Sequence, residues 1–415
     1  MTDRARSIGI WRAAAMFAAF AFSYFLSALL RAVTATLAPV FAQELHLGAG
    51  GLGLLAGAYF LGFALMQLPL GKALDRFGPR RVLLAFLSMA VIGCMAFAVA
   101  RGFTQLIVAR FLIGVGVAAC LMAPLTAFVQ LLSPAVQLRL NSWMLMSGSL
   151  GMLASTLPVQ QLLPLIGWRG LFWWLAGLIV LSMLAIACAA PRDPVARRGE
   201  QWFGSYRDIV VHPSFIRIIP MGFITYGGMI AMQALWAGPW LTEVVGQAPE
   251  RAAHGLFFIN LSMLVAFLFW GSVMPMLVRR GLDPDRLIAR GWPVGVVVLA
   301  ATIARGPLAG AGWWALWCMT TSVVTLSQPA VAQAFPKEQA GRALSAFNLV
   351  VFLGVFANQW GVGLVIDALS AAGLDRVECY QAAFGLLLFG SLASGAWYWW
   401  APGTRSPGGA LATHR

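Results

Sequence analysis

The chain has 415 residues, of which 60% are hydrophobic and only 10% are charged, and its formal net charge is +14. A soluble domain carries roughly 25% charged residues and about 45–50% apolar ones. The composition therefore excludes a soluble globular protein, because the chain cannot cover itself with a polar surface and lipid must solvate much of it. The positive charge does not indicate a nucleic-acid partner. The basic residues lie in short segments between apolar runs, where they orient a protein in the bilayer and attract anionic lipid headgroups.

Twelve apolar segments are long enough to cross a bilayer, which requires about 20 mostly apolar residues. In chain order they cover residues 12–40, 49–70, 80–100, 104–131, 140–162, 168–190, 216–241, 252–278, 285–304, 308–334, 341–368 and 378–400. The first is too long for a signal-peptide core and is predicted to be a retained transmembrane helix. We therefore expect an all-α membrane protein with six helices within 1–190, a polar linker at 191–215, six helices within 216–400 and a tail at 401–415.

The distribution of Lys and Arg predicts the orientation of the chain. If the N-terminus lies inside, 21 of the 28 Lys and Arg residues fall in inner segments, 5 fall in outer loops, and Arg31 and Arg110 lie within spans. We therefore expect both termini and the linker to be cytoplasmic. The expected address is a bacterial inner (plasma) membrane, which rests on the lack of targeting tails rather than on an address motif.

No catalytic or metal-binding pattern is visible. The five cysteines are scattered and the four histidines form no cluster, so neither a disulfide framework nor a zinc site is predicted. No Walker loop is present, which argues against transport driven by ATP. We therefore expect no enzyme activity, no metal and no cofactor.

One basic segment between the second and third spans carries a family signal. It reads Gly71-x3-Asp75-Arg76-x-Gly78-x-Arg80-Arg81, and it resembles the signature loop of the major facilitator superfamily. The run Arg110-Phe111-Leu112-Ile113-Gly114-Val115-Gly116 is similar to the fourth-helix pattern of that family. The resemblance covers essentially the whole chain. It implies two pseudo-symmetric six-helix bundles around a central cavity, alternating access by rocking of the bundles, and a protein that can work as a monomer.

The resemblance also implies roles for single residues. The signature loop is a conformational latch in that family, and here it would consist of Gly71, Asp75, Arg76, Gly78, Arg80 and Arg81. The second half keeps Gly271 and Arg280 at the spacing of Gly71 and Arg80, but Pro275 stands where Asp75 would be. Many drug/proton antiporters of the superfamily carry a Gly-Pro signature in the fifth helix. The segment 148–158 lacks that pair, which weakens a drug-efflux interpretation.

Arg31 stands well inside the first span, where a charged residue costs about 2.5–3.5 kcal/mol. Ser23, Ser27, Arg31 and Thr34 recur at spacings of four, four and three, so they share one helical face. A polar stripe that ends in a buried cation favours a cavity wall which binds an anionic substrate. The alternative is a structural arginine that pairs with backbone carbonyls or extends its head group outward. Arg110 lies nearer the outer end of span four, where the family-like pattern favours a structural role, and the alternative is a role in substrate binding or coupling.

The fourteen acidic residues all fall in loops or at the ends of spans, and Asp367 is the most deeply placed of them. Proton-coupled transporters commonly use an embedded Asp or Glu as the proton carrier. A cavity with arginine and no acid should prefer anions. Coupling would then use a proton that arrives with the substrate, or the exchange of one anion for another. Asp367 is either a proton site or a helix-end residue in contact with water.

Several uncharged polar residues fall on candidate cavity faces. Gln233 and Trp236 share a face of the seventh span, and Asn348 and Gln359 share a face of the eleventh. The amides could fix the orientation of a ligand, since each offers two donors and an acceptor. Their alternative role is hydrogen bonding between helices, which is a common use of buried amides in membranes.

The sequence thus predicts a secondary active transporter that moves a small organic anion by alternating access, as uptake by proton symport or anion exchange. The alternative is multidrug or lipophilic-cation efflux by proton antiport. A third interpretation, a transporter-like sensor that binds without turnover, is disfavoured by the short linker and tails.

Overall fold

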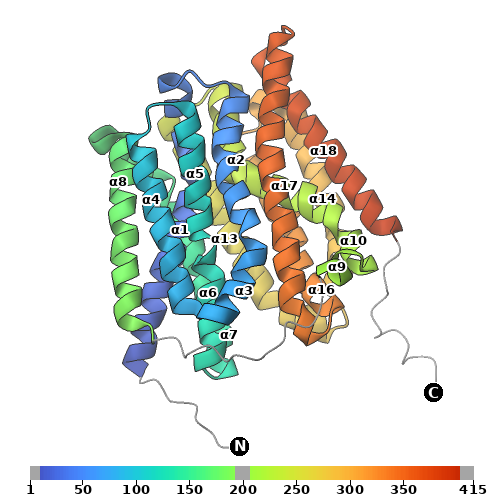
Figure 1. The fold of residues 1–415 in the computed structure, drawn as a ribbon. Coiled ribbons are helices and arrows are strands. Elements are labelled where there is room, and N and C mark those ends of the chain that lie inside the picture. The colour runs from blue at the N-terminus through green and yellow to red at the C-terminus, as the bar shows by residue number, and fades with distance from the viewer. Residues whose placement is uncertain (1–9, 192–205, 402–415) are drawn as a thin grey trace, which may run out of the picture.

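A computed structural model describes residues 10–191 and 206–401, and within these ranges every regular element is a helix. The helices stand side by side in one bundle (Figure 1). Before residue 191 they are α1 (Ile10–Glu44), α2 (Ala49–Leu65), α3 (Gln67–Phe77), α4 (Pro79–Val99), α5 (Phe103–Val117), α6 (Ala119–Leu131), α7 (Pro134–Ala154) and α8 (Leu157–Ala189). After residue 205 they are α9 (Tyr206–Val210), α10 (Pro213–Pro220), η1 (Met221–Tyr226), α11 (Gly227–Ala231), η2 (Met232–Trp236), α12 (Ala237–Pro239), η3 (Trp240–Val244), α13 (Pro249–Arg279), α14 (Pro284–Arg305), η4 (Gly306–Leu308), α15 (Ala311–Thr321), η5 (Ser322–Leu326), α16 (Ser327–Ala334), α17 (Lys337–Ala371) and α18 (Arg376–Trp400).

These elements make twelve crossings of the bundle. In the described ranges, ten helices are long and apolar enough to cross a membrane. The fifth and tenth crossings are interrupted. The fifth consists of α7 and the first part of α8, which ends at Gly167, where φ is +64°. The tenth consists of α15, η5 and α16, because a 3₁₀-helical stretch breaks its α-helix. The prediction of an all-α membrane protein with twelve transmembrane helices is confirmed.

The signature segment is not a loop, so that part of the prediction is wrong. Helix α3 continues to Phe77 and α4 begins at Pro79, which leaves only Gly78 between two helices. Gly78 has a φ of +82°, a conformation that glycine adopts at no steric cost. The following proline is favoured at the first position of a helix, because it needs no hydrogen-bond acceptor there.

The predicted linker at 191–215 is also partly helical. Its residues 192–205 lie outside the described part of the chain, as does the predicted tail from 402 onward. The remainder forms α9 and the start of α10, so the seventh crossing begins at Pro213 rather than at 216. Ile209 of α9 is buried, which shows that the end of this segment packs against the bundle. The boundaries of the two six-helix units stay a prediction.

The seventh crossing alternates between α- and π-helical turns. Three π-helical stretches, η1, η2 and η3, interrupt it. Pro220 directly precedes η1 and Pro239 directly precedes η3. A proline inside a helix removes one backbone hydrogen bond and clashes with the preceding turn, which provides a cause for the irregular winding. Irregular turns of this kind frequently occur at functional sites.

Helices α2 and α17 lie side by side near the middle of the bundle (Figure 1). We call the end with loops 45–48 and 372–375 the outer end, in keeping with the orientation that the basic residues predict, and the end with Gly78 the inner end. Close contacts at the outer part of this helix pair are made by glycines, namely Gly50, Gly53 and Gly57 of α2 and Gly363 of α17, which we call the glycine seam. A Cβ atom on Gly53 would overlap the Gln359 carbonyl group. Small residues let two backbones approach closely, so the seam joins the two halves of the chain at the outer end.

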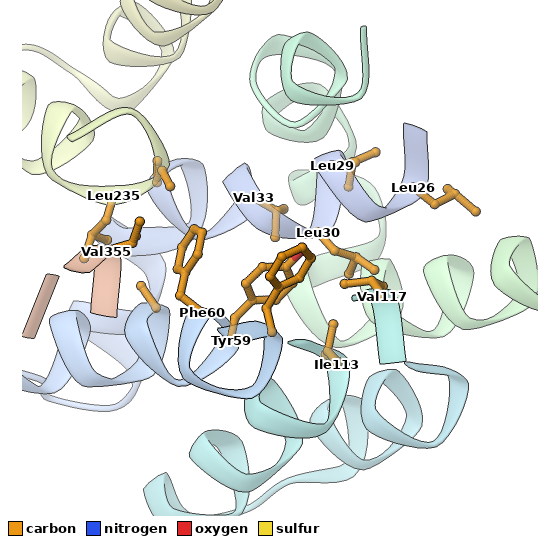
Figure 2. Close-up of a cluster of buried hydrophobic side chains, with 14 of the residues drawn as sticks. Leu26, Leu29, Leu30, Val33, Tyr59, Phe60, Ile113, Val117, Leu235 and Val355 are labelled. Atoms are coloured by element: carbon orange, nitrogen blue, oxygen red, sulfur yellow. The ribbon is translucent and has the colours of Figure 1, made fainter. Parts of the chain in front are cut away.

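The apolar core also passes from one half of the chain to the other. Figure 2 shows Leu30 and Val33 of α1 beside Tyr59 of α2, with Ile113 and Val117 of α5 below them. In the same view Phe60 points towards Leu235 and Val355, which belong to the second half. Burial of these side chains therefore stabilises the interface between the halves as well as each half.

Gly114→Ala should lower the melting temperature of the purified protein. A Cβ at Gly114 would overlap the backbone of Tyr59, and such overpacking costs about 1–3 kcal/mol. Gly177→Ala is the matched control, because a Cβ there meets no atom within 4 Å. Thermal unfolding in detergent distinguishes them, and equal melting temperatures would contradict the packing of α2 against α5.

Candidate functional site

Arg31 lies between the two halves of the chain, among aromatic rings from both. Its guanidinium carbon is 5.5 Å from the ring centre of Phe63 on α2 and 5.7 Å from that of Phe352 on α17. The two rings meet edge to face with their centres 4.5 Å apart. A cation within about 6 Å of an aromatic face is attracted to it. The contacts therefore place the charge at the meeting point of α1, α2 and α17.

Three tyrosines surround the same charge. Tyr24, Tyr59 and Tyr226 interact electrostatically with Arg31, and the Tyr59 hydroxyl donates a hydrogen bond to the Ser27 carbonyl at 3.2 Å. Tyr226 lies on η1, so the second half contributes here too. The sequence analysis missed these tyrosines. A signal was available, because three of only six tyrosines in the chain gather at one site.

The Arg31 guanidinium is incompletely paired. Its Nε atom is buried without a hydrogen-bond partner, and no carboxylate in the described ranges forms an ion pair with it. The Ser27 hydroxyl, one turn away, is also buried without a partner. A guanidinium offers five N–H donors in a planar fork that matches a carboxylate. The arrangement can therefore accept an anion that brings its own acceptor oxygens.

Thr34 and Arg110 pair with each other. Arg110 is 1% exposed and donates hydrogen bonds to the Leu30 carbonyl, at 3.1 Å, and to the Thr34 hydroxyl. Its guanidinium also lies 5.5 Å from the ring centre of Tyr59. These contacts tie α5 to α1 and α2 within the first half, which supports the structural role rather than a role in coupling. Because Thr34 binds Arg110 on α5, the predicted polar face of α1 contains Arg31 and also contacts Arg110.

The four polar residues predicted on the seventh and eleventh crossings are covered in this conformation. Asn348 accepts a hydrogen bond from Gln328 at 3.2 Å, an interaction between helices of the kind that the alternative interpretation expected. The side-chain N–H groups of Gln233 and Trp236 are buried without a partner, as are both polar atoms of Gln359. None of the described contacts joins these residues to Arg31. Their part in substrate binding stays a prediction.

The predicted latch residues spread over the inner end. Asp75 of α3 and Arg342 of α17 both lie close enough to Tyr206 of α9 to shift its pKa, so these three helices approach one another here. Partial burial raises the pKa of the Tyr206 phenol, Arg342 opposes the rise, and Asp75 adds to it. The other predicted latch residues lie elsewhere at the inner end. Arg80 donates to the Ala187 carbonyl of α8, Arg76 lies against the Phe77 ring, and Arg81 is exposed. Gly78 forms the turn, and Gly71 has open space beside its Cα. Asp75 is thus the member placed to join the two halves.

Asp367 lies at the outer end, where it binds the backbone of the other half. Its two carboxylate oxygens accept hydrogen bonds from the Ala49 and Gly50 N–H groups, each at 2.8 Å. It also lines a cavity of about 230 Å³ together with Glu243, Arg376 and Tyr380. Asp367 is therefore more than a solvated helix-end residue, although whether it carries a coupling proton is untested.

The chain is similar to known proteins in both sequence and structure. The family model for the Major Facilitator Superfamily matches residues 20–359. The multidrug transporter MdfA of Shigella boydii serotype 4 (strain Sb227) is 23% identical over 253 residues, which are 60% of each chain. The 4-hydroxybenzoate transporter PcaK of Pseudomonas aeruginosa (strain PAO1) is 28% identical over 162 residues, 39% of this chain and 36% of that one. The matches thus span about three-fifths or less of the length of these curated relatives.

A solved structure extends the likeness over nearly the whole fold. It is the inward-facing, unoccupied form of a bacterial homologue of the human lysosomal transporter Spinster. It aligns with a TM-score of 0.74 and 17% identity, covering 95% of this chain and 98% of the other. At this identity the likeness concerns the fold alone.

The two buried arginines should respond differently to replacement by methionine. Arg110→Met should lower the melting temperature, because hydrogen bonds from a charged donor contribute about 1.5–3 kcal/mol each. Arg31→Met should leave it unchanged or raise it, because replacing an incompletely paired buried charge by an apolar side chain of similar volume is often neutral or stabilising. Thermal unfolding without added ligand tests both, and a lower melting temperature for Arg31→Met would indicate a structural arginine.

Proposed function

Because the chain belongs to the Major Facilitator Superfamily, we propose that it is a secondary active transporter for a small organic anion. Transport proceeds by alternating access, in the direction of uptake, by proton symport or by exchange of anions. The observation that carries the proposal is Arg31, a cation at the interface of the two halves that has no carboxylate partner among residues 10–191 and 206–401.

The buried charge of Arg31 is energetically costly without a partner of opposite charge. Taking an ion out of water costs several kcal/mol unless a partner of opposite charge compensates. Aromatic rings and phenol groups lie around Arg31, no carboxylate of the described residues pairs with it, and its Nε is left without an acceptor. A substrate carboxylate or similar anion would supply the missing charge and could bind two N–H groups at once. The site thus selects for anions and against cations.

The shape of the surroundings supports a flat, unsaturated anion. Phe63 and Phe352 contact Arg31 from opposite halves, and rings of this kind pack against aromatic ligands by stacking or edge contacts. The tyrosine hydroxyls offer further donors and acceptors. The name of the relative PcaK, a 4-hydroxybenzoate transporter, agrees with this class of substrate, although its match covers only 39% of this chain.

The same residues suit alternating access. Arg31, Tyr59 and Phe63 belong to the first half, whereas Tyr226 and Phe352 belong to the second. A substrate held between them contacts both halves, so rocking of the halves changes its exposure while the site stays near the middle of the membrane. Residues from both halves around Arg31 thus support the proposal that this is the substrate site.

Multidrug or lipophilic-cation efflux by proton antiport is the second candidate. The multidrug transporter MdfA, which resembles 60% of this chain, favours it, and the aromatic rings could pack against a lipophilic compound. The charge of Arg31 opposes it, because a cation at this position would be repelled with no acid beside it to compensate. The charge of Arg31 therefore favours an anionic substrate over a lipophilic cation.

The anion proposal predicts the response of the purified protein to ligands. Benzoate-type anions should raise its melting temperature more than aliphatic carboxylates do, and tetraphenylphosphonium should not raise it. Arg31→Ala should weaken anion binding by about tenfold or more, since hydrogen bonds to charged groups contribute about 1.5–3 kcal/mol. Arg305→Ala, which removes an exposed arginine at the outer end, is the matched control. Stabilisation by the phosphonium cation that persists in Arg31→Ala would favour efflux instead.

The latch proposal concerns Asp75. Asp75→Asn should loosen the contact of α3 with α9 and α17, because it removes the charge that acts between them. Spin labels at Val136 and Arg290, exposed at the inner ends of α7 and α14, should then show a larger population at long distance. Asp283→Asn is the matched control, since Asp283 caps α14 and pairs with Arg286 within its own half. Identical distance distributions for the two variants would reject the latch.

A further inference from the structure

The N-terminus of α2 receives its cap from the opposite half of the chain. The residue at its own cap position, Gly48, has no side chain that could accept a hydrogen bond. Asp367 of α17 takes that role, because one oxygen binds the Ala49 N–H and the other binds the Gly50 N–H. The first N–H groups of a helix have no partner within the helix, and the helix dipole favours negative charge there. A carboxylate is thus bound where a local Ser, Thr, Asp or Asn would normally stand.

The glycines at this point make room for the carboxylate. A Cβ atom on Gly48 would lie 2.9 Å from both Asp367 oxygens, and one on Gly50 would lie 2.8 Å from Oδ2. Real Cβ atoms do not approach oxygen atoms so closely without displacement of a neighbour. The contact therefore depends on glycine at both positions, which shows that α2 and α17 fit each other around this charge.

The contact requires the ionised form of Asp367. An ionised carboxylate accepts through both oxygens, whereas a protonated one has a donor in place of part of its acceptor capacity and carries no charge. Hydrogen bonds from backbone N–H groups to a carboxylate are about twice as strong as neutral ones. Protonation would therefore weaken the joint between the halves, and it would do so at the outer end of the glycine seam.

Water from the outer side can reach this carboxylate. Asp367 lines the cavity of about 230 Å³, whose lining also includes Arg376, with a side chain that is 73% exposed. The titratable and charged groups around it are Glu243 from η3, Arg376, Cys379 and Tyr380 from α18, and the exposed His46 in the loop before α2. Glu243 and Arg376 pair with each other within the second half, so they do not join the two halves. The residues that α1 contributes to the lining, Ala38, Pro39 and Ala42, carry no charge.

The closed seam also contains a group that favours opening. Gln359 is fully buried beside Gly53, and both of its side-chain polar atoms lack a hydrogen-bond partner. A buried amide without partners is unfavourable, and water would satisfy it once α2 and α17 separate. The unpaired amide therefore opposes the contacts that hold α2 against α17.

We propose that Asp367 is the proton-sensitive latch of the outer gate: when ionised it holds α2 against α17, and a proton from the outer side releases it. The inference rests on the alternating-access fold and does not depend on the substrate. It assigns to Asp367 the site at which outer acidity opens the transporter.

Distances between spin labels test the proposal. Labels at Thr104 and Ala372, exposed at the outer ends of α5 and α17 in opposite halves, would be introduced after replacing the five native cysteines. Asp367→Asn should decrease the ratio of closed to open outer ends by about tenfold or more, since charge-assisted hydrogen bonds are lost. Gly48→Ala should act in the same direction with the charge retained, because its Cβ displaces the carboxylate. Acidification should open the wild-type protein and leave Asp367→Asn unchanged.

Glu243→Gln is the matched control, because it removes a carboxylate from the same cavity without touching a contact between the halves. It should keep the wild-type distances and the wild-type response to acid. His46→Asn, which changes the nearby histidine, should likewise keep both. The proposal is overturned if Asp367→Asn matches Glu243→Gln, if the wild-type protein does not open in acid, or if the acid response survives in Asp367→Asn. A readout by distance needs no substrate, so failure of the anion proposal would leave this result interpretable.

Discussion

The close contact of α2 with α17 is the constraint on which the other features of this protein depend. Glycines let the two backbones meet in the outer part of the pair, and Phe63 and Phe352 meet edge to face further along it. Those rings lie against Arg31, so the contact of the two helices positions the proposed substrate site. Asp367 sits at one end of the same pair, and Asp75 lies near the other end with Tyr206 and Arg342. One interface thus connects both ends of the transporter with its centre.

The two buried arginines differ in their partners, and this difference suggests different roles for them. Arg110 has a backbone carbonyl and a hydroxyl as acceptors, and its contacts stay within the first half. Arg31 instead faces the second half across aromatic rings, and in both arginines the Nε atom is buried without a partner. A buried charge with acceptors in its own half stabilises one arrangement of helices, whereas a charge at the interface of the halves can gain free energy from a ligand of opposite charge. Arg110 therefore joins helices of the first half, and Arg31 is the residue that we propose contacts the substrate.

The second half contains the irregular helices. Its seventh crossing includes three π-helical stretches, and its tenth is broken by a 3₁₀-helical stretch. Such turns leave hydrogen bonds longer or shifted and make bending easier than in a regular α-helix. Tyr226 and Trp236 lie at the ends of π-helical stretches, so residues near the centre are carried by helices that can adapt their shape.

Apolar length and charge placement along the sequence were enough to predict the twelve crossings, because the cost of exposing backbone and charge to lipid acts on each segment separately. The same local logic singled out Arg31 and Arg110 as the two basic residues within spans. It favoured a ligand contact for Arg31 and a structural role for Arg110, but it could not identify their partners, such as Leu30 for Arg110, which lies 80 positions away. Nor could it show that Asp367 caps α2, because that contact joins residues more than 300 positions apart. Only the packing of the helices decided which charges have partners and which half of the chain supplies them.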